Sequence, residues 1–375
     1  MTASPSTTQP QSDRKRLRVL HFVTGGFSGA TQVAIDLCAA TADDQETLLV
    51  LRRRANDPTA RVAQLRAQGL RVELVPRRPH LLTIWRLRQL CLVWQPDILV
   101  AHGFSDHLWG RYAGLLAGVP HLVHVEHNVR ERYGWWRRQQ SLWLARRTDA
   151  LVAVSDAVRE ALVRLGHPPE RCITIHNGID LGRWTQGLPW EDRENAVVMA
   201  ARFSRQKDHT TLIRAMHQMV KNGNPIPFYL AGGGSHRWQK RSQALIAELG
   251  VQPWVRLLGP TDDLPALYGR VRYCVLSSHY EGLPLALLEG MASGCCAIGS
   301  DVEGIREVIE PNRTGILVRH ADPEDLARAL EWLTRNPDQA SELAASGQRK
   351  VAQQFGRQQM IERYRTLLRR LTQRF

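Results

Sequence analysis

Two glutamates in one apolar stretch, Glu281 and Glu289, have the type and spacing to take part in chemistry. They lie in HYEGLPLALLEGMASGCC (279–296), with seven residues between them. A pair of carboxyl groups that hydrolyses glycosides must stand about 5–9.5 Å apart. If a single helix carried both glutamates, they would be about 12 Å apart along its axis. The spacing therefore disfavours a hydrolytic acid–base pair.

The proline between the two glutamates indicates another layout. Because proline is favoured at the first helical position, we expect a helix to begin near Pro284. Glu281 then lies in the loop before this helix and Glu289 in its second turn. Free N–H groups of Leu285 and Ala286 would suit a phosphate or a sugar hydroxyl, and the carboxylates can accept hydrogen bonds from hydroxyls. This layout predicts that the two glutamates contact the two ends of one extended ligand. In the alternative interpretation, Glu281 is only a turn residue and Glu289 only a solvated helix residue.

The elements that must position these residues alternate along the chain. Short apolar runs such as LRVLHFV (17–23) and HLVHVEH (121–127) are separated by helical patterns, which predicts βαβ units and parallel sheets. The pattern restarts after a polar segment, 186–196. We therefore predict an α/β fold with two Rossmann-like domains whose parallel sheets face a central cleft. The predicted organisation is a disordered lead-in (1–16), a first domain (17–185), a second domain (186–355) and a C-terminal amphipathic helix (356–375) that packs back across the domains.

Composition narrows the classes of protein without choosing a substrate. The chain has 375 residues, a net charge of +14 and six cysteines, none at the spacing of a zinc site. The charge favours a polyanionic partner: nucleic acid, anionic lipid or a phosphorylated substrate. No window reaches the ~20 apolar residues of a membrane span, and the first apolar run is too short for a signal peptide. We expect a cytoplasmic protein, at most bound peripherally to the inner face of the plasma membrane.

Four motifs in a fixed order carry a resemblance to a known family. They are TGGFSGATQ (24–32), IHNGIDLGRW (175–184), AARFSRQKDHTTLIRAM (200–216) and EGLPLALLEGMASG (281–294). This set resembles the family 4 glycosyltransferases, retaining sugar-nucleotide enzymes with the two-domain GT-B fold, over residues 17 to about 340. The spacing of GGFSG also lacks the GxGxxG pattern of dinucleotide-binding proteins, which disfavours an oxidoreductase.

The resemblance implies roles for particular residues. Two cations at the end of a strand, Arg202 and Lys207, can hold a diphosphate and stabilise the charge that grows on the leaving group. His127 matches the family histidine near the donor sugar; His102 and His107 are further cleft candidates. The predicted catalytic residues are His127, Glu281, Arg202 and Lys207. The predicted donor-binding residues add Gly25, Gly26, Gly29, Gly282, Leu283, Leu285 and Glu289 to Arg202, Lys207 and Glu281. The implied mechanism is a front-face substitution that needs no metal and no cofactor.

An aromatic and basic segment, 129–149, suggests where an acceptor binds. Interleaved aromatic and basic side chains suit an anionic membrane surface or a phosphorylated, lipid-linked acceptor. The alternative is a helix whose tryptophans pack inward; single-stranded nucleic acid is disfavoured because no nucleic-acid fold motif accompanies the segment. The predicted acceptor or membrane residues are Arg130, Arg132, Trp135, Trp136, Arg137 and Arg138.

These observations predict a glycosyltransferase. It would move a hexose or N-acetylhexosamine from a nucleoside-diphosphate sugar to a glycan or lipid-linked acceptor with retention, in envelope polysaccharide or lipopolysaccharide synthesis. Two alternatives stay open: a nucleotide-sugar 2-epimerase, which needs no acceptor, and a nucleotide-sugar-binding protein without activity.

Overall fold

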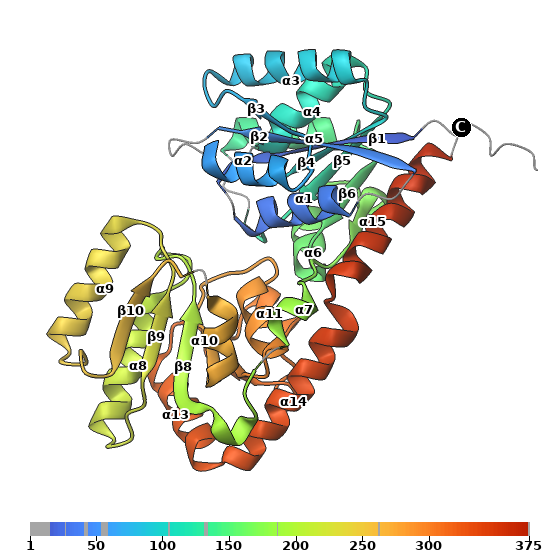
Figure 1. Ribbon diagram of the computed structural model, residues 1–375. Coiled ribbons are helices and arrows are strands. Elements are labelled where there is room, and N and C mark those ends of the chain that lie inside the picture. Colours follow the sequence, from blue (N-terminus) through green and yellow to red (C-terminus); the bar gives the residue numbers. More distant parts are fainter. Residues whose placement is uncertain are drawn as a thin grey trace, which may run out of the picture.

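The computed structural model describes residues 16–373 apart from 27, 41–43, 54–58, 104–105, 131–133, 186 and 262. The lead-in that we expected to be disordered falls almost wholly outside the described residues. Figure 1 shows two α/β domains joined by crossing segments. The predicted fold class, two parallel sheets in two domains, is confirmed.

The first domain is built on a seven-stranded parallel sheet of order β3-β2-β1-β4-β5-β6-β7. Its strands are β1 (Leu17–Thr24), β2 (Gln45–Arg52), β3 (Val72–Val75), β4 (Ile98–His102), β5 (His121–Glu126), β6 (Ala150–Ala153) and β7 (Cys172–Thr174). Its helices are α1 (Gly29–Ala39), α2 (Thr59–Ala67), α3 (His80–Trp94), α4 (Asp106–Ala117), α5 (Trp135–Ala145) and α6 (Asp156–Arg164), with a 3-10 turn at Pro169–Arg171.

Side-chain alternation along β2 divides the core of this domain into two layers. Leu48 and Val50 belong to a buried cluster with Leu87 of α3, whereas Leu49 and Leu51 belong to one formed with α1 and α2. Successive strand residues point to opposite faces, so a strand with helices on both faces is apolar throughout. The sheet therefore lies between α3 and α4 on one side and α1 and α2 on the other.

The second domain has a six-stranded parallel sheet of order β10-β9-β8-β11-β12-β13. Its strands are β8 (Glu194–Ala200), β9 (Phe228–Ala231), β10 (Val255–Gly259), β11 (Val271–Leu276), β12 (Cys296–Ser300) and β13 (Ile316–Val318). Its helices are α8 (His209–Lys221), α9 (His236–Glu248), α10 (Leu264–Arg270), α11 (Leu285–Ala292), α12 (Glu303–Arg306), α13 (Pro323–Arg335) and α14 (Pro337–Gln354), after a 3-10 turn at Trp190–Asp192.

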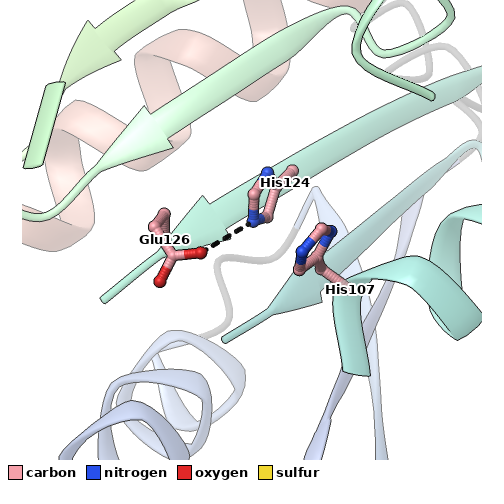
Figure 2. Close-up of side chains that lie close together, drawn as sticks. All are labelled: His107, His124 and Glu126. Atoms are coloured by element: carbon pink, nitrogen blue, oxygen red, sulfur yellow. Dashed lines mark ion pairs between the residues drawn. The ribbon is translucent and has the colours of Figure 1, made fainter. Parts of the chain in front are cut away.

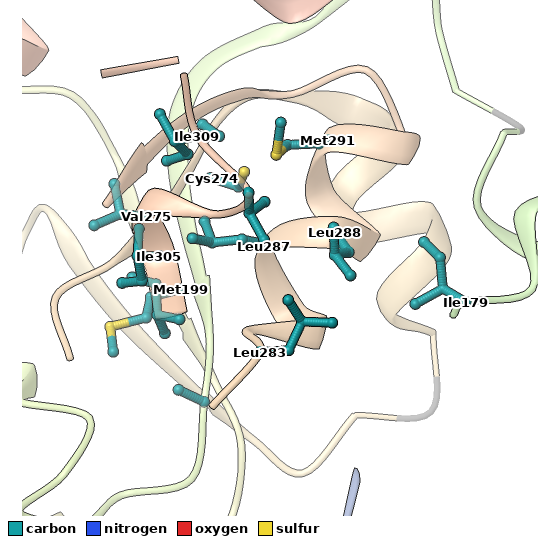
Figure 3. Packing of buried hydrophobic residues seen from close by; sticks show 14 of the residues in the cluster. Ile179, Met199, Cys274, Val275, Leu283, Leu287, Leu288, Met291, Ile305 and Ile309 are labelled. Carbon is teal, nitrogen blue, oxygen red and sulfur yellow. The ribbon is translucent and has the colours of Figure 1, made fainter. Parts of the chain in front are cut away.

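The helix that carries Glu289, α11, is anchored by a buried apolar face. Figure 3 shows Leu287, Leu288 and Met291 of this helix packed among Val275 of β11 and Ile305 of α12. Leu288 and Met291 have no exposed surface. Burying such side chains contributes roughly 1.5–3 kcal/mol each, which fixes the helix on the sheet.

Two segments connect the domains, and they pair with each other. The Ile179 N–H donates to the Phe355 carbonyl (2.9 Å), and the Arg357 N–H donates back to the Ile179 carbonyl (2.8 Å). Helix α15 (Arg357–Thr372), red in Figure 1, then runs from the second domain to the first. There Arg365 donates to the Ala40 carbonyl at 2.6 Å. The C-terminal helix thus packs back across the domains.

The chain enters the second domain earlier than the sequence pattern suggested. The sequence pattern predicts the boundary after residue 185, but α7 (Leu181–Trp184) packs against α10 and α11 of the second domain. Buried Trp184 contacts Tyr268 of α10 edge to face. Packing therefore assigns α7 to the second domain, although it belongs to the first in the sequence prediction.

None of the helices in the described part of the chain is both long enough and apolar enough to span a bilayer.

Candidate functional site

A cavity of about 270 Å³ opens between the two domains, at the carboxyl ends of their strands. From the first domain it is lined by Gly29, at the start of α1, and by His127, after β5. From the second domain it is lined by Arg202, after β8, and Glu281, after β11. Ligands of open α/β sheets bind at this edge, so the position agrees with a ligand site.

The structure brings together most of the predicted charged residues, but not all predicted donor residues reach the cavity. Those that line it are Gly29, His127, Arg202, Lys207, Glu281, Leu283 and Leu285. Those that are not among its lining residues are Gly25, Gly26, Gly282 and Glu289. The lining also contains Asn128, Asn177 and Gln206, which the sequence analysis missed. Asn177 lies in the NGID motif, so its position in that motif was a usable signal.

Gly282 and Gly25 act on the backbone around the cavity. A Cβ atom on Gly282 would lie 2.1 Å from the carbonyl oxygen of His127, so glycine permits the two domains to touch here. A Cβ atom on Gly25 would lie 2.8 Å from the carbonyl oxygen of Arg52. Both glycines therefore allow close approach of two backbones beside the site.

Lys207 and Glu281 form an ion pair across the floor of the cavity. The Lys207 Nζ lies 2.7 Å from Glu281 Oε1, and their side chains are 16% and 6% exposed. Gln206 donates to the Tyr280 carbonyl at 2.9 Å, which joins the two loops that carry the pair. Arg202 is exposed beside them. An anionic group would compete with Glu281 for Lys207, while Arg202 offers a further positive charge.

The first turn of α11 differs in one detail from the expected geometry. The helix begins at Leu285, and Pro284 precedes it as the N-cap. The Leu285 N–H donates to the Leu283 carbonyl at 3.1 Å, so it is not the free donor we expected. Leu285 and Ala286 do line the cavity.

Glu289 lies half-buried in the second turn of α11, where burial raises its pKa to about 7. Arg183 of α7 and Lys207 oppose this rise in pKa but do not cancel it. The carboxyl group is therefore held where only a hydrogen-bond donor or a cation would favour its ionised form. Arg183 is a further residue that the sequence analysis missed.

His127 faces the cavity as a neutral imidazole. Burial lowers its pKa to about 4, although the Glu126 carboxylate opposes this shift. Its Nε2 atom has no hydrogen-bond partner among the described residues. A neutral ring with a free nitrogen can bind a sugar hydroxyl, but near neutral pH it is not charged and is a poor general acid.

Glu126 holds the backbone that carries His127. As alternation predicts, its side chain turns away from the cavity and is fully buried. Its Oε1 accepts hydrogen bonds from the N–H groups of His127 (2.8 Å) and Asn128 (3.0 Å). Figure 2 shows the Oε2 side of the carboxylate, 3.5 Å from His124 Nε2, with the ring of His107 stacked on His124. No motif or spacing in the chain indicates this positioning contact.

The same three residues have the donor types of a metal site. Ligand atoms of His107, His124 and Glu126 all lie within 4.8 Å of one another. Arg111, however, points a guanidinium nitrogen at His107 Nδ1 from 2.5 Å. Nδ1 must accept this bond, so the Nε2 of His107 carries the proton and has no lone pair for a metal. The donor set fits a buried hydrogen-bond network better than a metal site.

A second group of possible ligands, Asp156, His176 and Glu307, joins the domains. Glu307 follows α12 of the second domain, and its carboxylate accepts from the N–H groups of Asp156 (2.9 Å) and Ala157 (2.6 Å) at the start of α6. Its Oε2 also lies 3.1 Å from His176 Nε2. Both oxygens are thus already used in capping a helix of the other domain.

Of the other cleft candidates, His102 and His107 do not line the cavity. Both are fully buried, and His102 Nε2 lies 3.1 Å from His21 Nδ1. His102 ends β4 and turns toward the sheet, whereas His107 lies in α4 with its ring stacked on His124, so neither side chain reaches the cleft.

The tryptophans of α5 point outward. Trp135 and Trp136 are 63% and 72% exposed, so the alternative in which these tryptophans pack inward is wrong. Arg137 and Arg138 are exposed on the same helix. Arg130 lies over the ring of Tyr280 of the second domain, with 5.1 Å between its Cζ and the ring centre. Arg132 lies outside the described residues.

Comparison with known proteins identifies the family. Residues 27–183 match the family description "Glycosyltransferase Family 4", and residues 182–350 match "Glycosyl transferases group 1". An alpha-maltose-1-phosphate synthase of Mycolicibacterium smegmatis is 30% identical over 310 residues, which cover 72% of this chain and 78% of that protein.

Two further proteins extend the comparison. The UDP-Gal:alpha-D-GlcNAc-diphosphoundecaprenol alpha-1,3-galactosyltransferase of Escherichia coli is 25% identical over 64% of this chain and 66% of its own length, so the chain spans just under two thirds of that relative. The crystal structure of Anabaena Alr3699/HepE in complex with UDP-glucose superimposes with a TM-score of 0.84, at 21% identity, over 94% of this chain and 99% of that chain. With its two facing parallel sheets and these matches, the chain belongs to the family 4 glycosyltransferases of GT-B fold.

Proposed function

We propose that this protein transfers a hexose or N-acetylhexosamine from a nucleoside-diphosphate sugar to a glycan or lipid-linked acceptor, with retention of configuration. One observation carries the proposal: a single cavity is lined by Arg202, Lys207 and Glu281 from one domain and by His127 from the other. Such an arrangement can hold a diphosphate and a sugar on one wall and admit an acceptor from the other.

In this proposal, positively charged side chains of the second domain, and not a metal ion, bind the diphosphate. Arg202 and Lys207 bind the diphosphate and stabilise the negative charge that develops as the glycosidic bond to the donor breaks. Glu281, released from Lys207, accepts a hydrogen bond from a sugar hydroxyl. Glu289 accepts from the ribose diol once the ligand reaches it.

The acceptor proton completes the reaction. The acceptor hydroxyl approaches the anomeric carbon from the face that the diphosphate leaves, and the departing phosphate oxygen takes its proton. His127, neutral and with a free Nε2, binds a hydroxyl of the donor sugar and orients it. No covalent enzyme intermediate, metal or cofactor is part of this mechanism.

The exposed aromatic and basic face of α5 supports an acceptor at a membrane surface. Trp135, Trp136, Arg137 and Arg138 together suit the interface of an anionic bilayer. One relative's name specifies a diphosphoundecaprenol-linked acceptor. We propose envelope polysaccharide or lipopolysaccharide synthesis at the inner face of the plasma membrane.

Incubation of the full chain with labelled sugar nucleotides, with and without membrane extract, tests this function. UDP-galactose and UDP-N-acetylglucosamine are suitable first donors. Transfer that requires the extract supports the proposal. Acceptor-free conversion of the donor would instead identify a 2-epimerase, and binding without turnover would identify a nucleotide-sugar-binding protein. Retention is checked by the anomeric configuration of the product.

A further inference from the structure

The first domain has a second hollow, well separated in sequence from the donor residues. A groove of about 540 Å³ runs between β3, the edge strand of the sheet, and α3. Leu82, Leu90 and Val93 form the helix wall, and Leu74 and Val75 belong to the strand wall. Leu82 and Val93 are eleven residues apart, about 16 Å along a helix. The remaining lining residues are Pro76 and the polar or charged Arg53, Glu73, Arg86 and Gln89, so the groove is long, with an apolar majority and polar side chains among it.

Apolar side chains around the groove are exposed. Val93 is 83% exposed, Leu81 78% and Trp85 48%, all on α3. Nine of the twelve large hydrophobic side chains that are exposed among the described residues lie on α3, α4 and α5. Exposed apolar side chains gathered on neighbouring helices of one domain mark an interaction site, and this concentration indicates a lipid environment.

One end of the groove is strongly basic. His80, the first residue of α3, has its pKa lowered by burial and by the nearby charges of Arg52, Arg137 and Arg78. Arg52 is paired with Asp106, the one acidic group that acts on His80 among the described residues. Arg53 lies in the groove itself. Arg86 of α3 and Glu73 of β3 also line the groove, so its own lining carries two positive charges and one negative charge. This excess of positive charge suits a phosphate group.

This basic end lies at the same edge of the sheet as the donor cavity. The Arg53 N–H donates to the Val75 carbonyl (3.0 Å), and the Gly25 N–H donates to the Arg52 carbonyl (2.8 Å). Gly25 begins the loop that leads to Gly29, which lines the cavity. A phosphate at the basic end would therefore place a glycan attached to it toward the reaction cleft.

We propose that the groove between β3 and α3 binds the hydrocarbon chain of a polyprenyl-phosphate-linked acceptor, with its phosphate at the basic end. The inference rests on the proposed function, because it names the acceptor class of the same reaction. A peptide that pairs with β3 is the weaker occupant, since a strand of four residues offers few backbone hydrogen bonds.

Binding of farnesyl phosphate to the full chain, measured by equilibrium dialysis, tests the groove without requiring turnover. The helix offers matched variants: Val93→Glu changes a lining residue, and Leu92→Glu changes its exposed neighbour, which does not line the groove. Leu82→Glu and Leu81→Glu form a second pair. We expect at least a tenfold loss of affinity for Val93→Glu and Leu82→Glu, and less than a twofold change for the neighbours.

The phosphate position has its own test. Arg53→Gln should weaken farnesyl phosphate at least fivefold while it leaves farnesol binding within twofold. Equal loss in both members of each pair, or no saturable binding to the unchanged protein, would overturn the inference. Binding to anionic vesicles distinguishes a membrane surface from the groove. If all four glutamate variants lose vesicle binding equally, and the unchanged protein does not bind farnesyl phosphate, this face binds the bilayer surface instead.

Transfer assays separate this inference from the proposed function. A glycan on a long polyprenyl diphosphate is compared with the same glycan diphosphate on a butyl group. We expect Val93→Glu to raise KM at least tenfold for the long-chain acceptor only. Groove-dependent farnesyl phosphate binding without any transfer would keep the groove and reject the function. Transfer to both acceptors, insensitive to Val93→Glu, would keep the function and reject the groove.

Discussion

Replacing Glu289 by glutamine should stabilise the protein and weaken its binding of the donor. In the ligand-free protein the pKa of this carboxyl is about 7, against an ordinary value of 4.5. The native state therefore keeps the proton at pH values where the unfolded chain has lost it. Stability consequently falls as the pH rises from about 4.5 to about 7, and the loss is constant above that range.

The size of the effect follows from the two pKa values. They differ by about 2.5, and each pKa unit corresponds to about 1.4 kcal/mol, so ionised Glu289 costs up to about 3 kcal/mol at pH 8. This is an upper limit because the side chain is only half-buried and water screens part of its charge. Glutamine keeps the shape and removes the ionisation. For a domain of this size the gain corresponds to a rise in Tm of roughly 6 °C.

Thermal unfolding of the two proteins at pH 5 and pH 8 measures the gain. We expect Glu289→Gln to unfold at a higher temperature at pH 8 and at nearly the same temperature at pH 5. Glu342→Gln, which changes an exposed glutamate on α14, is the matched control and should show no such difference. Equal unfolding temperatures of Glu289→Gln and the unchanged protein at pH 8 would refute the argument.

Nucleotide binding gives the second half of the prediction. If the ionised carboxylate accepts hydrogen bonds from ribose, UDP affinity of the unchanged protein should fall up to tenfold for each pH unit below about 7. The Glu289→Gln variant should bind UDP more weakly at pH 8 and lack this pH dependence. Titration calorimetry at several pH values measures both, and unchanged affinity in the variant would remove Glu289 from the ribose site.

Three further substitutions test the site and its domain contacts. Lys207→Ala should reduce turnover at least a hundredfold, and it should lower stability by about 3 kcal/mol because it leaves Glu281 buried without its partner. Adding Glu281→Gln should restore the midpoint of urea unfolding but not turnover. Recovery of both would contradict the diphosphate role of Lys207. Gly282→Ala places a Cβ 2.1 Å from the His127 carbonyl oxygen, so the domains should move apart. We expect a larger radius of gyration in X-ray scattering and a higher KM for the donor. An unchanged radius of gyration would contradict this contact. Glu307→Ala removes the cap of α6 and should cost about 1 kcal/mol in thermal unfolding while turnover stays within tenfold.

Much of the fold could be predicted from local patterns. Apolar runs separated by helical patterns indicate parallel sheets, and the polar segment 186–196 marks where the second series begins. The exact crossing point could not be predicted, because α7 is short and its assignment depends on Trp184 packing against Tyr268, eighty-four residues further along the chain.

The candidate site, like the fold, could be predicted only where local sequence patterns determine it. Residues such as Arg202 and Glu281 follow strands and so could be placed at one edge of a sheet. Their pairing partners could not: the bond between Lys207 and Glu281 joins loops from different strands. The role of Glu126 could not be predicted from strand alternation. Alternation predicts that its side chain points away from the cleft, but it does not predict that the carboxylate accepts a hydrogen bond from the backbone N–H of His127.

The return of α15 to the first domain has a consequence for biosynthesis. Its buried residues, among them Ile361, Tyr364 and Leu368, belong to the same apolar core as Val33 of α1. The ribosome makes this helix some three hundred residues after α1. Part of the surface of the first domain therefore stays uncovered during synthesis until α15 has been made and docks on it.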